Sequence, residues 1–244
     1  MHTLKLTLAY DGTRYAGWQR QRARPTIQAA IERALYQITR ERVRVIGSGR
    51  TDAGVHALAQ VAHVRVRSGL PSKSLQRALN SVLPPDIAVT QIVIMPDTFH
   101  ARFQATWKRY QYHIVNDSVI LPFDGPFAHL VRAPLDVARM RREARSLLGR
   151  HDFRAFHKTS RPVSDARRTI RQAQLRAQGS HLYIEVEGDG FLHTMVRRII
   201  GTLIDVGRGF RPPGTIVRIL ETHDRRLLGP TAPANGLCLV KVTY

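Results

Sequence analysis

Hydrophobic residues recur along the chain with two periods, which together predict an alternation of strands and helices. Leu4, Leu6 and Leu8 occupy every second position, as in a strand, and Asp11-Gly12 predicts a turn after them. A helical period follows Pro25-Thr26, with Thr26 as the expected N-cap. The apolar residues of this helix are Ile27, Ala30, Ile31, Ala34, Leu35 and Ile38. The chain therefore opens with a strand and an amphipathic helix.

The same alternation continues to the middle of the chain. A short strand at Val43 and Val45 is expected to lead into a Gly-rich segment, residues 47–54. Beyond it, Val64 and Val66 alternate with His63, Arg65 and Arg67, which predicts a strand with one basic face. A second helix is expected over 75–82 and must end at Pro84-Pro85, and a buried strand over 87–94.

The second half repeats this order of elements without repeating its residues. The pattern predicts a strand around Trp107 to Tyr112, a helix capped by Asp136 that runs to about Leu148, and a strand over 182–186. Helices over 192–204 and 216–220 and a last strand over 237–242 complete it. We expect an α+β fold of two α/β subdomains, with mostly antiparallel sheets packed against helices and a basic cleft between them. The expected domains are 1–104 and 105–244.

Charge adds the first functional information. The 244 residues hold 38 Lys+Arg against 18 Asp+Glu, a formal net charge of +20, and a body so basic repels itself unless a polyanion binds. Arginine outnumbers lysine, and guanidinium groups grip phosphate and stack on bases, which favours RNA. Codon bias or thermal adaptation also produces arginine-rich chains. The composition thus favours a nucleic-acid partner over a solvated basic face.

Cysteine content and hydropathy favour a cytoplasmic protein. Cys238 is the single cysteine, so neither an intramolecular disulfide framework nor a thiolate metal cluster is possible. No N-terminal segment resembles a secretory signal, and no apolar run approaches the ~18 residues that a membrane span requires. We therefore expect a protein that does not cross a membrane.

The segment Gly47-Ser48-Gly49-Arg50-Thr51-Asp52-Ala53-Gly54 is the most unusual in the chain. One interpretation is a phosphate-binding loop, although the lysine of a P-loop is missing and a strand, not a helix, follows. Another is a catalytic carboxylate, Asp52, kept ionised by the guanidinium of Arg50. On the local pattern alone an ordinary turn, with Asp52 bonded to the backbone and Arg50 in solvent, is favoured, because Asp is common in Gly-rich turns.

A resemblance to a known family favours the catalytic interpretation. The block Gly49-Arg50-Thr51-Asp52-Ala53-Gly54-Val55-His56-Ala57 resembles the motif around the catalytic aspartate of the tRNA pseudouridine synthase A family. Five further blocks agree in order: Tyr10 to Gln21, Phe99 to Phe103, Arg109 to Tyr112, Leu192 to Arg197, and Thr231 to Leu237. The similarity spans nearly the whole chain, except that 117–134 and 158–180 carry little of the pattern.

The resemblance implies a role for each matching residue. Asp52 is the expected catalytic residue; the expected substrate-binding residues are Arg50, Arg197, Tyr110 and Leu237. The arginines would pair with or steer the carboxylate, the tyrosine would stack on the target base, and the leucine would line the uracil pocket. From the residues alone, Tyr110 and Tyr112 also fit half-buried strand aromatics, and Arg197 also fits the wet side of a helix.

The chemistry that the resemblance implies suits these residues. Uridine loses its N-glycosidic bond, the freed uracil rotates, and a carbon–carbon bond forms to the same ribose, so no cofactor is needed. A carboxylate either attacks the ribose carbon or removes a ribose proton. The nucleotide must leave its stack, and an aromatic ring replaces the lost stacking, worth ~1–3 kcal/mol per base.

Partners and metals complete the expectations. The resemblance implies a homodimer that binds the anticodon arm of tRNA and modifies tRNA positions 38, 39 and 40. The histidines have no metal-binding spacing, since His151 and His157 are six residues apart and His56 and His63 seven, so no metal site is expected. A non-catalytic RNA-binding or ribosome assembly protein would explain the charge equally well. The two differ at Asp52, whose loss abolishes turnover only in an enzyme.

Overall fold

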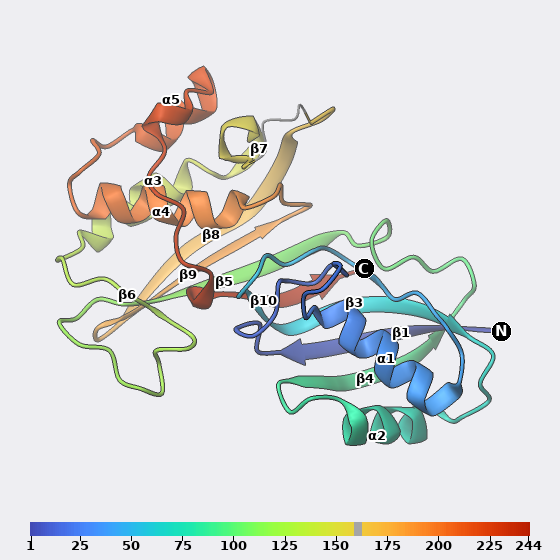
Figure 1. The fold of residues 1–244 in the computed structure, drawn as a ribbon. Coiled ribbons are helices and arrows are strands. Elements are labelled where there is room, and N and C mark those ends of the chain that lie inside the picture. Colours follow the sequence, from blue (N-terminus) through green and yellow to red (C-terminus); the bar gives the residue numbers. More distant parts are fainter. Residues whose placement is uncertain (159–162) are drawn as a thin grey trace. The chain divides into compact units, whose positions relative to one another are not determined.

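The structure is a computed structural model that describes residues 1–158 and 163–244. It divides into two compact units: unit 1 holds Met1–Thr106 with Leu239–Tyr244, and unit 2 holds Trp107–Cys238. Ten strands, paired almost entirely antiparallel, and five α-helices occur in the described residues (Figure 1). This confirms the expected α+β class with mostly antiparallel sheets.

Unit 1 is built on strands β1 (His2–Tyr10), β3 (His56–Val66) and β4 (Ile87–Met95). The order is β4-β1-β3-β10, where β10 spans Leu237–Thr243, and the two-residue strand β2 (Ile46–Gly47) pairs with β3. β1 pairs antiparallel with β3 from His2 opposite Val66 to Leu8 opposite Gln60. The alternating leucines of β1 are buried, so the period-two prediction is confirmed here.

Two predictions for unit 1 are wrong in detail. The expected strand at Val43 and Val45 does not form, since strand geometry begins only at Ile46. β4 forms as expected but is not a buried strand: Ile94 is 60% exposed, because β4 is the edge strand and only alternate residues face the core.

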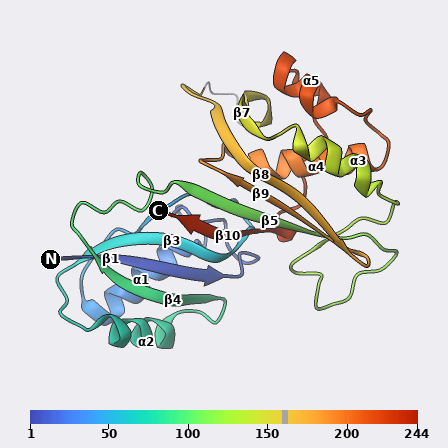
Figure 2. The same ribbon diagram turned by 180° about the vertical axis from the view of Figure 1, so that it is seen from behind.

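Helices α1 (Ile27–Thr39) and α2 (Ser72–Val82) cover one face of the unit 1 sheet (Figures 1 and 2). The Thr26 side chain accepts a hydrogen bond from Ala29 N, which confirms the expected N-cap of α1. Ile27, Ile31 and Leu35 are fully buried along one stripe of this helix. α2 ends at Val82, before Pro84-Pro85 as predicted.

Unit 2 carries an antiparallel set of strands in the order β5-β9-β8-β7. Their bounds are β5 Trp107–Val115, β9 His181–Gly188, β8 Arg167–Gln178 and β7 Gly149–Asp152, and β6 (His129–Leu130) pairs parallel with β5. The pattern did not predict β8. Its alternation is hidden because arginine and glutamine fill most positions and the register with β9 shifts between Ile170 and Gln172.

Helices α3 (Val137–Arg145) and α4 (Met195–Gly207) lie on one face of this sheet, and α5 (Thr215–Thr222) follows (Figures 1 and 2). The Asp136 side chain caps α3 through Arg139 N, as predicted. α4 begins three residues later than the period suggested, because Thr194 adopts a left-handed conformation with φ 61°. Short 3-10 turns span Arg154–Phe156, Arg225–Leu227 and Ala234–Gly236.

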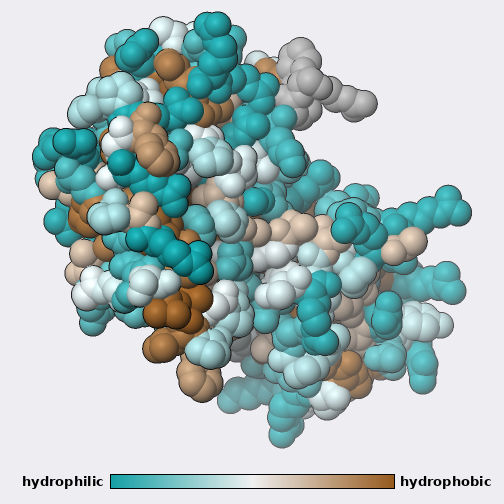
Figure 3. All heavy atoms as spheres, turned by 60° about the vertical axis from the view of Figure 1, so that its left-hand side comes forward, coloured by the Kyte–Doolittle hydropathy of each residue, from teal (hydrophilic) through white to brown (hydrophobic). Residues whose placement is uncertain are grey.

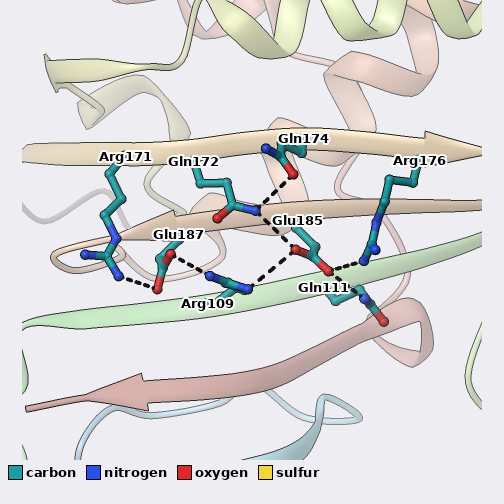
Figure 4. Close-up of polar contacts among 8 residues, drawn as sticks. All are labelled: Arg109, Gln111, Arg171, Gln172, Gln174, Arg176, Glu185 and Glu187. Carbon is teal, nitrogen blue, oxygen red and sulfur yellow. Dashed lines mark hydrogen bonds and ion pairs between the residues drawn. The ribbon is translucent and has the colours of Figure 1, made fainter.

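A network of charged side chains lies across β5, β9 and β8 (Figure 4). Glu187 accepts hydrogen bonds from Arg109 at 3.0 Å and Arg171 at 2.9 Å, and its own side chain is only 2% exposed. Glu185 accepts from Gln111 at 3.0 Å and Arg176 at 2.6 Å. Burial raises the pKa of Glu187, but the bonds from both arginines outweigh it, so the net pKa lies below its usual value. The carboxylate therefore stays ionised although it is buried.

Hydrophilic side chains predominate on the face drawn in Figure 3, and hydrophobic side chains gather low on that face. Large hydrophobic residues are strongly exposed on the segment between β5 and β6, namely Val119, Leu121, Phe123 and Phe127. Among the described residues, no helix has the length and apolar character required to cross a bilayer.

Candidate functional site

The Gly-rich loop around Asp52 follows β2 and is tied to the neighbouring strands by hydrogen bonds. Ser48 N donates to Val61 O at 2.7 Å, and the buried Ser48 hydroxyl donates to Gln60 Oε1 at 2.8 Å. The Gln60 amide in turn donates to Gly49 O at 3.1 Å. The hydroxyls of Tyr10 and Thr51 lie 2.9 Å apart. The backbone on both sides of Arg50 is thus held from β1 and β3.

Residues Tyr15 to Trp18 contact the loop from its other side. Trp18 N donates to Thr51 O at 3.1 Å, and Gly54 N donates to Tyr15 O at 3.3 Å. Gly17 has φ 94°, and a Cβ there would lie 2.6 Å from Thr51 O and 3.0 Å from Asp52 C. Only glycine allows this approach, because any side chain at position 17 would push against the backbone that carries Asp52.

Asp52 lies at the turn that this framework positions. Its carbonyl accepts a hydrogen bond from Val55 N at 3.2 Å, so residues 52–55 form a tight turn that leads directly into β3. The residue is partly buried, whereas the preceding Thr51 is buried at 6% exposure. Arg50 is exposed, and its side chain makes no hydrogen bond or ion pair with any residue that the structure describes. The loop thus presents a carboxylate on a rigid backbone next to a solvent-facing guanidinium.

A second acid lies at the same end of β3. His56 is buried at 4% exposure, and its Nδ1 atom lies 3.1 Å from both Gly12 N and the Asp11 carboxylate. Burial raises the pKa of Asp11, but hydrogen bonds from Thr13 and the nearby imidazole lower it further, so the net pKa is below its usual value. Asp11 therefore remains a carboxylate and holds the 10–13 turn against the start of β3.

Tyr110 belongs to unit 2, on β5 opposite Val186 of β9. Its ring is 7% exposed and packs edge-on against Phe191, with centroids 5.2 Å apart and planes at 89°. In edge-on packing the edge of one ring contacts the face of the other, so the pair does not cover both faces of either ring. The ring is thus more deeply buried than the half-buried strand aromatic that the alternation alone suggested.

Arg197 lies in the first turn of α4 and is fixed to a segment far along the chain. Its Nε donates to Ala232 O at 2.7 Å, and Ala232 N donates back to Arg197 O at 3.1 Å. This reciprocal pair directs the guanidinium toward the 232–237 segment, which is not the behaviour of an arginine on the wet side of a helix.

Tyr112 holds the same segment from β5. It is fully buried, and its hydroxyl donates to Pro233 O at 2.9 Å. Gly236 lies so close that an added Cβ would be 2.7 Å from the Tyr112 ring. Burial raises the pKa of the Tyr112 hydroxyl and the charge of Arg197 lowers it, with burial the stronger effect. Arg197 and Tyr112 thus position the turn that ends at Leu237, whose side chain is 4% exposed.

The structure divides the expected site residues between the units. Asp52 and Arg50 belong to unit 1, and Tyr110, Arg197 and Leu237 to unit 2. Sequence reasoning missed the residues that hold them in place, above all Gly17, Gln60 and Tyr112. Gly17 and Tyr112 fall within the blocks that carried the resemblance, so their positions were visible in the sequence although their contacts were not.

One group of side chains in unit 2 could hold a metal ion. His113, Asp124 and His181 each offer a ligand atom, and these atoms lie within 4.8 Å of one another. The two imidazoles already contact each other, with His113 Nε2 2.8 Å from His181 Nδ1. The three residues come from β5, the following segment and β9, so no spacing in the sequence signals them. The expectation of no metal stays a prediction.

Comparisons with known proteins identify the family of the chain. The family model described as tRNA pseudouridine synthase matches residues 7–104 and 144–244. The chain is 45% identical over 246 residues to tRNA pseudouridine synthase A of Moorella thermoacetica, covering all of both chains. It is 45% identical over 244 residues to the protein of that name from an Exiguobacterium species, of which it covers 98%. It is also 41% identical to tRNA pseudouridine synthase A 2 of Clostridium perfringens, again over all of both chains. The chain therefore belongs to the tRNA pseudouridine synthase family of isomerases.

Proposed function

We propose that this chain converts uridine to pseudouridine in the anticodon arm of tRNA, at tRNA positions 38, 39 and 40, with Asp52 as the catalytic carboxylate. The observation that carries the proposal is the rigid setting of Asp52. Its loop donates a hydrogen bond to Val61 O and accepts hydrogen bonds from Gln60 and Trp18, while the residue itself is only partly buried. A site that must act on a flipped nucleotide needs such a fixed carboxylate, because catalysis depends on positioning.

The other residues have complementary roles in this proposal. Arg50, exposed beside Asp52, contacts a phosphate next to the target nucleotide. Tyr110 stacks on the extruded uracil, supported by its edge-on partner Phe191. Arg197 steers the carboxylate, and Leu237 contacts the uracil; their support is the fixed turn between Ala232 and Leu237. Unit 1 thereby contributes a basic side chain to tRNA binding, and unit 2 contributes basic, aromatic and apolar side chains.

The reaction needs no external oxidant or reductant. The carboxylate either attacks the ribose carbon, which releases uracil and leaves a covalent ribosyl ester, or removes a ribose proton to expel uracil. In both routes uracil turns and its C5 bonds to the ribose carbon. The ester C–O bond breaks in the first route, and the carboxylic acid returns its proton to the ribose in the second. The C5 proton then leaves and N1 is protonated. A primary kinetic isotope effect with ribose deuterated next to the glycosidic carbon supports proton removal; its absence supports attack.

The test uses loss of the C5 hydrogen. An unmodified tRNA transcript carrying tritium at uracil C5 is incubated with the protein and no cofactor, and released tritium is counted. We expect turnover by the native chain and none by Asp52→Asn, with tRNA binding retained in both. Asp117→Asn, an exposed aspartate in unit 2, is the matched control and should turn over normally. Full activity in the Asp52→Asn variant, or binding without tritium release by the native chain, would contradict the proposal.

We further propose that the enzyme acts in the cytoplasm as a homodimer. The single cysteine, Cys238, favours a reducing compartment. The support for the dimer is the segment between β5 and β6, where Leu121 is 64% and Phe123 90% exposed. Contiguous exposed hydrophobic side chains are typical of protein–protein interfaces. Light scattering should give twice the mass of the 27.6 kDa chain, and Leu121→Ser/Phe123→Ser should shift it toward one chain. A native monomer at micromolar concentration is the result that speaks against the dimer.

A further inference from the structure

A second basic site occurs in unit 1, at the end of β3 that lies away from Asp52. A pocket of about 660 Å³ is lined by residues from the segment before β2, the end of β3 and the turn after β4. The side chains that give it its character are Arg42, Arg44, Arg65, Arg67, His63 and His100. His63, Arg65 and Arg67 occupy alternate positions of one chain segment, so they share one face.

The arginines of this pocket form no ion pair with a carboxylate among the described residues. Glu41 is the one acid of its lining, and both its oxygens accept backbone hydrogen bonds, from Arg67 N at 2.8 Å and Ser68 N at 2.9 Å. Among the described residues, Arg65 donates to a carbonyl, that of Asp97, and to no carboxylate. The exposed side chains of Arg44 and Arg67 make no hydrogen bond or ion pair within the part of the chain that the structure describes. The pocket thus keeps a net positive charge that the protein does not neutralise.

The two histidines add hydrogen-bond donors. His63 Nδ1 accepts from Ala101 N at 3.1 Å, and His100 Nδ1 accepts from Arg102 N and Phe103 N, each at 3.2 Å. A neutral imidazole whose Nδ1 accepts carries its hydrogen on Nε2. Burial, the neighbouring His100 and Arg65 lower the pKa of His63 to about 4, so this imidazole is neutral at physiological pH. Guanidinium and imidazole N–H groups therefore dominate the pocket. They suit an oxyanion as ligand, because an oxyanion only accepts hydrogen bonds.

The position of the pocket decides which phosphate it fits. β3 begins at His56, directly after the Asp52 turn, and Arg65 lies nine residues further along the strand. At ~3.3 Å per strand residue, the two ends are about 30 Å apart. A phosphate in this pocket therefore cannot belong to the nucleotide next to a uridine held at Asp52.

We infer that this pocket binds backbone phosphates of the tRNA at a stem outside the anticodon arm. The inference rests on the proposed function for the identity of the ligand, but it concerns binding and not catalysis. Arg44 and Arg67 supply the charge, and the histidine N–H groups orient the phosphate oxygens. The site thereby lets the enzyme measure the distance between a remote stem and its target loop.

The test removes the two unpaired guanidinium groups. Arg44→Ala/Arg67→Ala should raise the Kd for full-length tRNA about tenfold, and the slope of log K against log salt should become shallower by about one to two units. KM should rise with kcat unchanged at saturating tRNA. Arg77→Ala, an exposed arginine on α2, is the matched control and should change none of these quantities. Equal melting temperatures of all variants exclude unfolding.

Two shorter ligands distinguish the sources of phosphate. An isolated anticodon stem-loop cannot reach the pocket, so native and double-variant proteins should bind and modify it equally well. Inorganic phosphate should bind the native protein only weakly. The inference is overturned if full-length tRNA binds both proteins alike, if the stem-loop loses as much affinity as tRNA, or if inorganic phosphate binds tightly without affecting tRNA. Loss of turnover in Asp52→Asn is measured separately, so each idea can fail alone.

Discussion

Replacing Gly17 by alanine tests whether the backbone beneath Asp52 sets its activity. The new Cβ would lie 2.6 Å from Thr51 O, whereas ordinary contacts begin near 3.4 Å, so the 51–52 backbone must retreat by the difference, about 0.8 Å. A misplacement near 1 Å costs on the order of 100-fold in rate when a catalytic group must be aligned. Alanine at φ 94° also costs about 1–2 kcal/mol, and loss of the Trp18 to Thr51 hydrogen bond about 1 kcal/mol more.

We therefore expect Gly17→Ala to lower kcat for tritium release about 100-fold and to lower the free energy of unfolding by about 2–3 kcal/mol in urea. Gly179→Ala is the matched control: φ is 60° there, yet nothing lies within 4 Å of the added Cβ. It should lose about 1 kcal/mol and no activity. A Gly17→Ala enzyme within a few-fold of native kcat would refute the idea that the position of this backbone limits catalysis.

Three further outcomes follow from the buried polar groups. Glu187→Ala leaves Arg109 and Arg171 without their carboxylate partner and should cost about 2–3 kcal/mol of unfolding free energy in urea. Asp224→Ala, which breaks a pair with the 90% exposed Arg226, should change the urea midpoint much less. Tyr112→Phe leaves Pro233 O unpaired and should cost about 1–2 kcal/mol, with a rise in KM as the turn before Leu237 loosens; an unchanged melting temperature contradicts this. The pKa of His63 is about 4 in the folded chain against 6.5 unfolded, so the unfolded state takes up the proton first. Stability should fall as pH drops from 6.5 to 4, and His63→Gln should flatten that part of the profile.

The period of hydrophobic residues was enough to predict a helix or strand where that element buries one face. α1 and α3 begin at the caps that Thr26 and Asp136 predict, because an N-cap is a local interaction between residues three apart. The prediction failed where tertiary contacts outweigh local preference. The buried residues of β8, Ile170, Ala173 and Leu175, do not alternate strictly, because the register with β9 shifts between Ile170 and Gln172, so its alternation was not visible.

The candidate site likewise has residues that the sequence could single out and contacts that only the structure shows. Asp52 and Arg50 lie in one short segment with unusual composition, so the sequence could single them out. The contacts of Tyr112 with Pro233 and of Arg197 with Ala232 join residues 121 and 35 positions apart. No periodicity reports such pairs, because they depend on which strand and helix faces meet after folding.

The sequence by itself determined the class of the molecule: a basic α+β protein with a carboxylate in a Gly-rich turn, in blocks that resemble one family. These properties depend on composition and on local spacing, which need no folded chain. The tertiary structure decided how that turn is held, with Gly17 against its backbone and Gln60 beneath it, and which arginines keep an unneutralised charge at the far end of β3. Close packing and hydrogen-bond pairing across the sheet create these features, so they exist only once distant segments are brought into contact.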